Sequence, residues 1–144
     1  DITDMFMNRG VIITEVDRNG KRSELDATDG GLATDLPLAI LVGPGSASGS
    51  EVLSAALRDN GRAVLIGQTT FGKGSVNFLV ELSNGGALYV TAARWLTPKG
   101  QLIEGVGLTP DIVVAPGDTE ATTGVGPQLF AAIDYLRQQI RTAR

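Results

Sequence analysis

Two glycine-rich segments contain the residues of this sequence that could do chemistry. The first is GPGSASGSE, residues 43–51, and the second is GQTTFGKGS, residues 67–75. The second segment fits the phosphate-binding pattern GxxxxGK through Lys73, but Gly74 stands where a Ser or Thr should hold Mg²⁺. The first segment approximates the dinucleotide-binding pattern GxGxxG, with Ser48 in place of the third glycine. Both matches are incomplete, which makes a nucleotide-binding protein the weaker hypothesis.

The residues around the two segments also disfavour nucleotide binding. A phosphate loop opens a helix, whose amino end contributes to the anion site. Residues 75–82 instead alternate with a period of two, which is typical of a strand. A dinucleotide fold needs an acidic residue about 20 positions after its glycines, whereas the next strand ends in Gly67-Gln68. Ser48 also fails the GxSxG nucleophile pattern, because Ser46 occupies the place of the first glycine.

A third hypothesis joins the two segments. Each follows one strand of a predicted strand–helix–strand unit, and loops that follow neighbouring parallel strands lie at the same edge of the sheet. Ser48 at the start of the helix and Lys73 in the second loop are therefore expected to meet. A buried lysine loses its charge more easily and can then take a proton from a serine, as in Ser-Lys hydrolases. We expect Lys73 to be buried, since residues 69–74 offer no carboxylate to keep it charged.

The composition excludes several other classes of site. The 144 residues include no His and no Cys, so the chain cannot supply a Ser-His-Asp triad, a thiol nucleophile or a Cys/His zinc site. We expect no metal and no cofactor. The net charge is −4 without a basic stripe, which argues against nucleic acid as a partner. No apolar run reaches the ~20 residues of a transmembrane segment, and DITDMFMNRG lacks the features of a signal peptide.

Hydrophobic periodicity and turn residues predict a mixed α/β fold with a central strand–helix–strand unit, β-hairpins and a C-terminal helix. The Asn19-Gly20 and Asn84-Gly85-Gly86 turns indicate two hairpins. Strands are expected at 11–16, 21–27, 38–42, 63–66, 76–82, 87–93 and 112–114, and helices at 1–8, 48–59 and 128–141. The 38–42 run is continuously apolar, as in a strand buried on both faces. The predicted division is a domain at 1–114, a linker at 115–126 and a C-terminal helical segment at 127–144.

The segments GSASGSE, GRAVLIGQTTFGKGS, LTPKG and GVGLTPDIVV together resemble the carboxyl-terminal processing proteases, also called tail-specific proteases. The similarity covers residues 1–114. The resemblance implies a crotonase-like catalytic core and a Ser-Lys serine peptidase. Its nucleophile would be Ser48 and its general base Lys73. The backbone amide of Gly49 would stabilise the oxyanion, and Asn77 stands where the family commonly has a Gln that orients the lysine.

The resemblance also implies partners and a location. Family members bind substrate tails through a PDZ domain, and they act on unfolded or carboxyl-terminal protein segments in exported compartments such as the periplasm or cell envelope. The chain is accordingly expected to be the catalytic portion of a longer protease, with oligomers as an open question. The alternative is a catalytically incompetent fragment that acts as a peptide- or protein-binding module.

Each candidate also has a purely structural interpretation. Ser48 and Glu51 form the S-x-x-E pattern of a helix capping box, and Glu51 is expected to be a cap or a packing partner. Ser46 is the second candidate for the nucleophile. Gly72 and Gly74 are expected to shape the loop by adopting positive φ angles.

Overall fold

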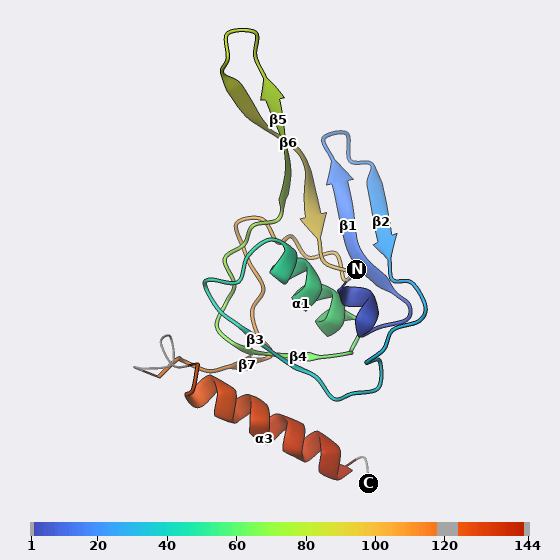
Figure 1. Cartoon of the computed structure of the whole chain (residues 1–144), viewed down its shortest axis with the longest axis vertical. Helices are drawn as coiled ribbons and strands as arrows, with labels where there is room; N and C mark the ends of the chain where they lie inside the picture. The colour runs from blue at the N-terminus through green and yellow to red at the C-terminus, as the bar shows by residue number, and fades with distance from the viewer. Residues whose placement is uncertain (1, 118–123, 143–144) are drawn as a thin grey trace.

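The structure, a computed structural model, describes residues 2–117 and 124–142. These residues form an antiparallel sheet, a parallel sheet and two α-helices (Figure 1). The elements are η1 (Thr3–Met5), β1 (Val11–Asp17), β2 (Arg22–Asp26), β3 (Ala39–Val42), α1 (Gly49–Asp59), β4 (Val64–Gly67), β5 (Ser75–Glu81), β6 (Ala87–Leu96), β7 (Ile112–Val113) and α3 (Pro127–Thr142). The predicted mixed α/β class, the central strand–helix–strand unit, the hairpins and the C-terminal helix are confirmed.

The antiparallel sheet has the strand order β2-β1-β6-β5. Both hairpins form at the predicted turns: the Asp17 amide donates to the Lys21 carbonyl at 3.0 Å, and the Leu82 amide donates to the Gly86 carbonyl at 2.8 Å. The distal parts of β5 and β6 extend as an arm beyond the rest of the sheet (Figure 1). Strand β6 lies between β1 and β5 and pairs with both of them. Strand β5 begins two residues after Lys73.

The parallel sheet has the order β3-β4-β7, and its central strand pairs in parallel with both neighbours. Helix α1 connects β3 to β4 and packs against β4 and against β1 of the other sheet. Helix α3 contacts β3 and β4 from the opposite side (Figure 1). The described part of the chain is therefore layered as antiparallel sheet, α1, parallel sheet and α3.

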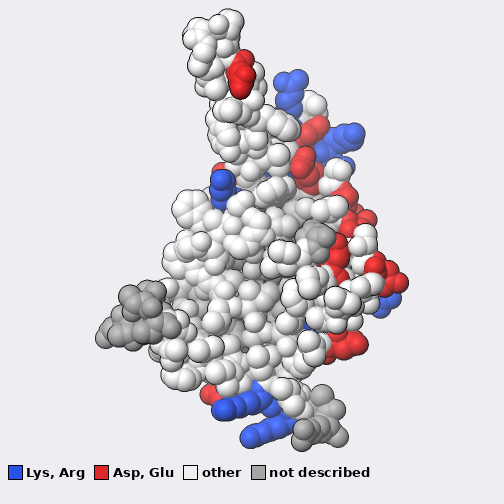
Figure 2. All heavy atoms as spheres, in the orientation of Figure 1, with Lys and Arg blue, Asp and Glu red and all other residues white. Residues whose placement is uncertain are grey.

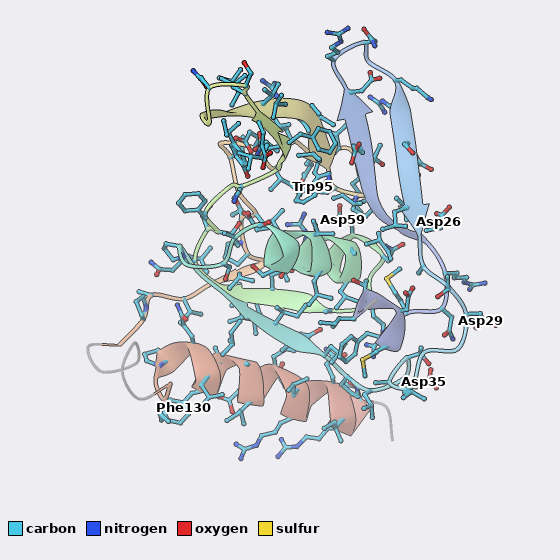
Figure 3. All side chains as sticks on the ribbon, turned by 45° about the horizontal axis from the view of Figure 1, so that its top comes forward. Asp26, Asp29, Asp35, Asp59, Trp95 and Phe130 are labelled. Atoms are coloured by element: carbon cyan, nitrogen blue, oxygen red, sulfur yellow. The ribbon has the colours of Figure 1, made fainter. Side chains whose placement is uncertain are left out.

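The main core lies around α1. Ala55, Ala56 and Leu57 face inward and are almost fully buried, and they join a single apolar cluster with Leu65 of β4 and Ile12 of β1. Burial of each large apolar side chain contributes about 1.5–3 kcal/mol. Trp95 is partly buried and packs against the same cluster (Figure 3). This core fixes α1 between the two sheets.

Two expectations about the elements are wrong. The predicted helix at 1–8 is only a 3₁₀ turn, Thr3–Met5. The chain is held there by tertiary bonds, since the Asp4 carboxylate accepts from the Thr28 amide at 2.7 Å and the Met5 carbonyl accepts from the Ala33 amide at 2.8 Å. Strand β3 is not buried on both faces, since Leu41 is 42% exposed, and the strand lies at the edge of its sheet.

The end of the chain is described in part. The predicted linker at 115–126 includes residues 118–123, which lie outside the described residues, and the proposed domain division stays a prediction. Helix α3 starts at Pro127, next to the predicted boundary. None of the helices in the described residues is long and apolar enough to span a bilayer.

Asp59 ties the end of α1 to the turn that follows β6 (Figure 3). Its side chain is 1% exposed, accepts from Arg58 Nε at 2.9 Å and accepts from the Lys99 amide at 3.1 Å. Burial acts to raise the pKa of the carboxyl, but hydrogen bonds from Thr97, Lys99 and Arg58 outweigh it and lower the pKa below its ordinary value of 3.8. The ionised form therefore stabilises the fold.

Asp59→Asn is expected to lower the free energy of unfolding at neutral pH by about 2 kcal/mol, because a buried charge-assisted hydrogen-bond set is lost. A carboxyl group whose pKa is lower in the native state than in the unfolded state stabilises the protein at pH values above the unfolded-state pKa. This contribution disappears as the pH falls through the native-state pKa. The difference between the two proteins, measured by urea unfolding, should shrink below about pH 4. A difference that stays constant down to pH 2 would contradict this role.

Candidate active site

The two glycine-rich loops meet at the carboxyl ends of β3 and β4, as predicted from the parallel arrangement. The Phe71 amide of the second loop donates to the Ser46 carbonyl of the first at 2.9 Å. The Gln68 amide donates to the Val42 carbonyl at the same distance. The second loop leads into strand β5 and not into a helix, so the Lys73 loop does not open a helix as a phosphate-binding loop does.

Ser48 has the most unusual backbone of the site. Its φ is +57° and its ψ is −120°, and it is the sole non-glycine residue with a positive φ among the described residues. Such a conformation costs on the order of 1–3 kcal/mol in a non-glycine residue and tends to occur at functional sites. It places Ser48 on a sharp turn between β3 and α1, half-buried. This is the strand–turn–helix setting of a nucleophile elbow, although the sequence does not match GxSxG.

Gly49 is the first residue of α1 and is exposed. The first N–H groups of a helix have no acceptor within the helix and point out of its amino end. The predicted oxyanion donor thus stands next to the Ser48 side chain, at the positive end of the helix dipole.

Glu51 is the centre of the site. It is 0% exposed, although it is a carboxylate one turn into α1. One oxygen, Oε1, accepts from the Gly72 amide at 2.7 Å and from the Thr70 hydroxyl. The other, Oε2, accepts from the Ser48 amide at 2.9 Å and from the Lys73 amide at 2.8 Å. The buried carboxylate is thereby satisfied by four donors from both glycine-rich loops.

The shared oxygen fixes how far apart Ser48 and Lys73 can be. Their backbone nitrogens both bond to Oε2 of Glu51, so the two nitrogens are separated by no more than the sum of 2.9 and 2.8 Å. The predicted juxtaposition of these two residues is thus present at the backbone level. The S-x-x-E spacing correctly indicated the capping-box contact between Glu51 and the Ser48 amide. The spacing could not show the second half of the contact, to the loop of Lys73.

A second carboxylate fixes the other side of Lys73. Glu104 accepts from the Gly74 amide at 2.7 Å. The backbone amides of residues 72, 73 and 74 therefore all donate hydrogen bonds to carboxylates. The glycines allow the loop to lie directly against residues 103–107. A Cβ on Gly74 would come within 2.6 Å of the Glu104 backbone nitrogen, and one on Gly72 within 2.9 Å of the Gly107 nitrogen. Gly72 has the predicted positive φ, of +89°, whereas Gly74 does not and is required for close packing.

Lys73 is exposed, which corrects the prediction that it is buried. The glycines on either side of it are buried, and the inner side of the loop is occupied by its own amides as they bond to Glu51 and Glu104. The side chain is therefore directed away from the core. Phe71 of the same loop is also 67% exposed. The absence of carboxylates in the loop sequence therefore does not lead to burial of the Lys73 side chain.

Asn77 lies in β5 at a register irregularity between Val76 and Asn77. Its amide nitrogen donates to Ser75 Oγ at 3.1 Å, and its Oδ1 accepts from the Thr91 hydroxyl at 2.7 Å. These bonds hold the side chain on the sheet, and its role in orienting Lys73 stays a prediction.

The other serines of the first loop have structural bonds. Ser46 Oγ accepts from the Gly43 amide at 3.2 Å, and Ser50 Oγ donates to the Ala47 carbonyl at 2.8 Å. Ser46 therefore serves the turn, while the Ser48 backbone has the strained geometry. Within the described residues, no cluster of three or more Asp or Glu side chains is placed to hold a metal ion.

Comparisons with known proteins show the family to which the chain belongs. The family model of peptidase family S41 matches residues 1–114. The chain belongs to peptidase family S41. It is 44% identical over 116 residues to a carboxy-terminal-processing protease of Bartonella bacilliformis, a match that covers 78% of this chain and 26% of that protein. It is 43% identical over 122 residues to the chloroplastic carboxyl-terminal-processing peptidase 3 of Arabidopsis thaliana, covering 85% of this chain and 22% of that protein.

Among solved structures, the photosystem II D1 C-terminal processing protease superposes with a TM-score of 0.75 and 38% sequence identity, over 79% of this chain and 30% of that one. The match thus spans 22–30% of the length of these relatives. The S41 family and the fold are shown for this part of the protein.

Glu51→Gln tests whether the buried carboxylate joins the two loops. Either orientation of the amide would direct its NH₂ group at two N–H or O–H donors, so we expect a loss of about 3 kcal/mol or more in the free energy of unfolding, measured by urea denaturation. Glu104→Gln is the matched control, because Glu104 is less buried and accepts from one loop amide. Equal losses in the two variants would refute a special role of Glu51.

Proposed function

We propose that the chain is the catalytic portion of a serine endopeptidase that uses a Ser48-Lys73 dyad. The observation that carries this proposal is the Glu51 carboxylate, which holds the amides of both residues on one oxygen. Membership in family S41 supports a peptidase. The strained backbone of Ser48, next to the free amino end of α1, supports Ser48 as the nucleophile.

The chemistry of the dyad is derived from these positions. Ser48 Oγ attacks the carbonyl carbon of the scissile peptide bond as its proton passes to neutral Lys73 Nζ. The negative charge that develops on the carbonyl oxygen is stabilised by the Gly49 amide. The lysine then gives the proton to the leaving amine, and an acyl-enzyme on Ser48 remains. Water, deprotonated by Lys73, releases the carboxylic acid product and restores the serine.

Because Lys73 is exposed, the mechanism requires that its side chain be removed from water when the substrate is bound. A lysine acts as a base near neutral pH when its charged form is disfavoured by removal from water. In the proposed enzyme this cover is supplied by the bound peptide and by the remainder of a longer protease. The matched segments make up 22% and 26% of two relatives, which is consistent with such a division. The same exposure would leave a short fragment catalytically incompetent, and a peptide- or protein-binding module is then the alternative function.

The proposed substrates are unfolded or carboxyl-terminal segments of proteins, delivered by a PDZ domain of the longer chain. Two relatives are named for carboxyl-terminal processing, and an extended chain is the form in which a peptide bond can enter a site between loops. We propose an exported location for the protein, such as the periplasm or cell envelope.

The test is cleavage of an unstructured protein with an apolar carboxyl tail by the full-length protein and by its Ser48→Ala and Lys73→Ala variants. Loss of an activated nucleophile or its base typically costs at least about 10⁴-fold in rate, and we expect such losses in both variants. Ser46→Ala is the matched control and should retain most activity.

Two outcomes would overturn parts of the proposal. Equal cleavage by the parent and both variants would exclude the dyad and would make Ser48 a turn residue. Loss in Ser46→Ala with retention in Ser48→Ala would assign the nucleophile to Ser46. A melting temperature within about 2 °C of the parent for each variant shows that the effect is chemical, since ~1 kcal/mol shifts the midpoint by at least that much.

A further inference from the structure

A groove on the antiparallel sheet is lined by three arginines. Its cavity has a volume of about 530 Å³ and lies between the β1–β2 hairpin and β6. Arg18 and Arg22 come from the hairpin, and Arg94 comes from β6. The floor is apolar, with Val16, Leu96 and Leu102 among its residues. We call this feature the arginine groove.

The strand register places the arginines on one face. Val16 pairs with Arg22 of β2 on one side and with Arg94 of β6 on the other. Directly paired residues of neighbouring strands project to the same face of a sheet. Arg22 and Arg94 therefore flank the apolar Val16, and two guanidinium groups stand on either side of a strip on which an extended segment could lie.

The groove begins beside the loop of Lys73. Arg94 pairs with Ser75, the first residue of β5, two positions after Lys73. The amide of Trp95, the next residue in β6, donates to the Gly74 carbonyl at 2.7 Å. Arg94 is thus a close neighbour of the Lys73 loop in the sheet, and a peptide that passes this loop in the proposed protease could extend towards the groove.

The arginines of the groove lack acidic partners. In residues 2–117 and 124–142, no ion pair or hydrogen bond is found for the side chains of Arg18, Arg22 and Arg94. The one carboxylate that lines the groove is Asp17, which accepts from the amides of Asn19 and Lys21 at 2.8 and 2.9 Å. Those backbone bonds lower the pKa of Asp17 and fix its carboxylate in the hairpin turn. Figure 2 shows basic and acidic side chains gathered on the β1–β2 side of the molecule, with the arm of β5 and β6 nearly uncharged.

In a second and larger cavity, of about 1020 Å³, the arginine side chains do have hydrogen-bond partners within the protein. Its Arg58 bonds to Asp59 and to the side chain of Gln101, and its Arg62 donates to backbone carbonyls that include that of Phe6. These guanidinium groups are used by the fold. The arginines of the arginine groove are not, and they are available to a ligand.

We infer that the arginine groove is a subsite for carboxylate groups of the peptide substrate, an inference that rests on the proposed peptidase function. Arginine presents a planar set of donors that matches a carboxylate in a bidentate manner. The apolar floor would contact the neighbouring methylene groups and side chains. The carboxylate could belong to an acidic side chain or to the free carboxyl terminus of the substrate, and both are chemically alike to the groove.

The experiment measures peptide binding, so that it does not depend on cleavage. The protein is the full-length chain with Ser48→Ala, and the probes are three fluorescein-labelled peptides of one apolar sequence. One peptide has a free carboxyl terminus, one is amidated with an internal Glu, and one is amidated with Gln at that position. Fluorescence anisotropy gives the Kd of each, with and without Arg22→Gln together with Arg94→Gln. Arg141→Gln in α3 is the matched control.

A carboxylate subsite predicts that at least one of the two acidic peptides binds about fivefold or more tightly than the neutral peptide at low salt. The double variant should remove that advantage, and the control should keep it. The advantage should also decrease as salt is raised, because exposed charges are screened. The peptide that loses affinity identifies the source of the carboxylate, side chain or terminus.

Equal affinities for the three peptides, or an advantage that survives in the double variant, would overturn the inference. An equal loss in Arg141→Gln would do so too, since it would reduce the effect to net charge. Mass spectrometry of the peptides separates this result from the proposed function: cleavage by the Ser48→Ala protein would refute Ser48 as the nucleophile and leave the binding comparison intact.

Discussion

The site depends on one buried carboxylate. Glu51 belongs to the helix that follows the first glycine-rich loop, but most of its hydrogen bonds go to the second loop. A carboxylate with no exposure is costly unless donors surround it, and here both loops supply them. Because the Glu51 carboxylate needs hydrogen-bond donors from both loops, it fixes the positions of the two loops. It thereby also fixes the backbone positions of Ser48 and Lys73.

The surrounding fold provides a rigid base for that contact. The core packs α1 between two sheets, so the first turn of the helix has a fixed place relative to β4 and the loop after it. Glu104 and the close packing of Gly74 on residues 103–107 hold the same loop from its other side. Such a support is what a catalytic pair needs, because small errors in position cost large factors in rate.

Much of this arrangement could be predicted from local sequence. The NG turns and the apolar run before Gly43 gave correct hairpins and a correct strand–helix–strand unit, since those patterns depend on neighbouring residues. The burial of Lys73 and of Leu41 was wrong, because exposure depends on which elements cover a strand or a loop. The positive φ of Ser48 and the two-loop contact of Glu51 are tertiary properties, and S-x-x-E spacing alone indicates only the helix cap.

The most direct test of the account is covalent labelling of the full-length protein with a fluorophosphonate, which reacts with activated serines, followed by peptide mass spectrometry. The account predicts a single adduct on Ser48, with a labelling rate that falls by at least about tenfold in both Lys73→Ala and Glu51→Gln. Labelling of Ser48 at an unchanged rate in Glu51→Gln would contradict the claim that this carboxylate assembles the pair, and an adduct on Ser46 would contradict the assignment of the nucleophile.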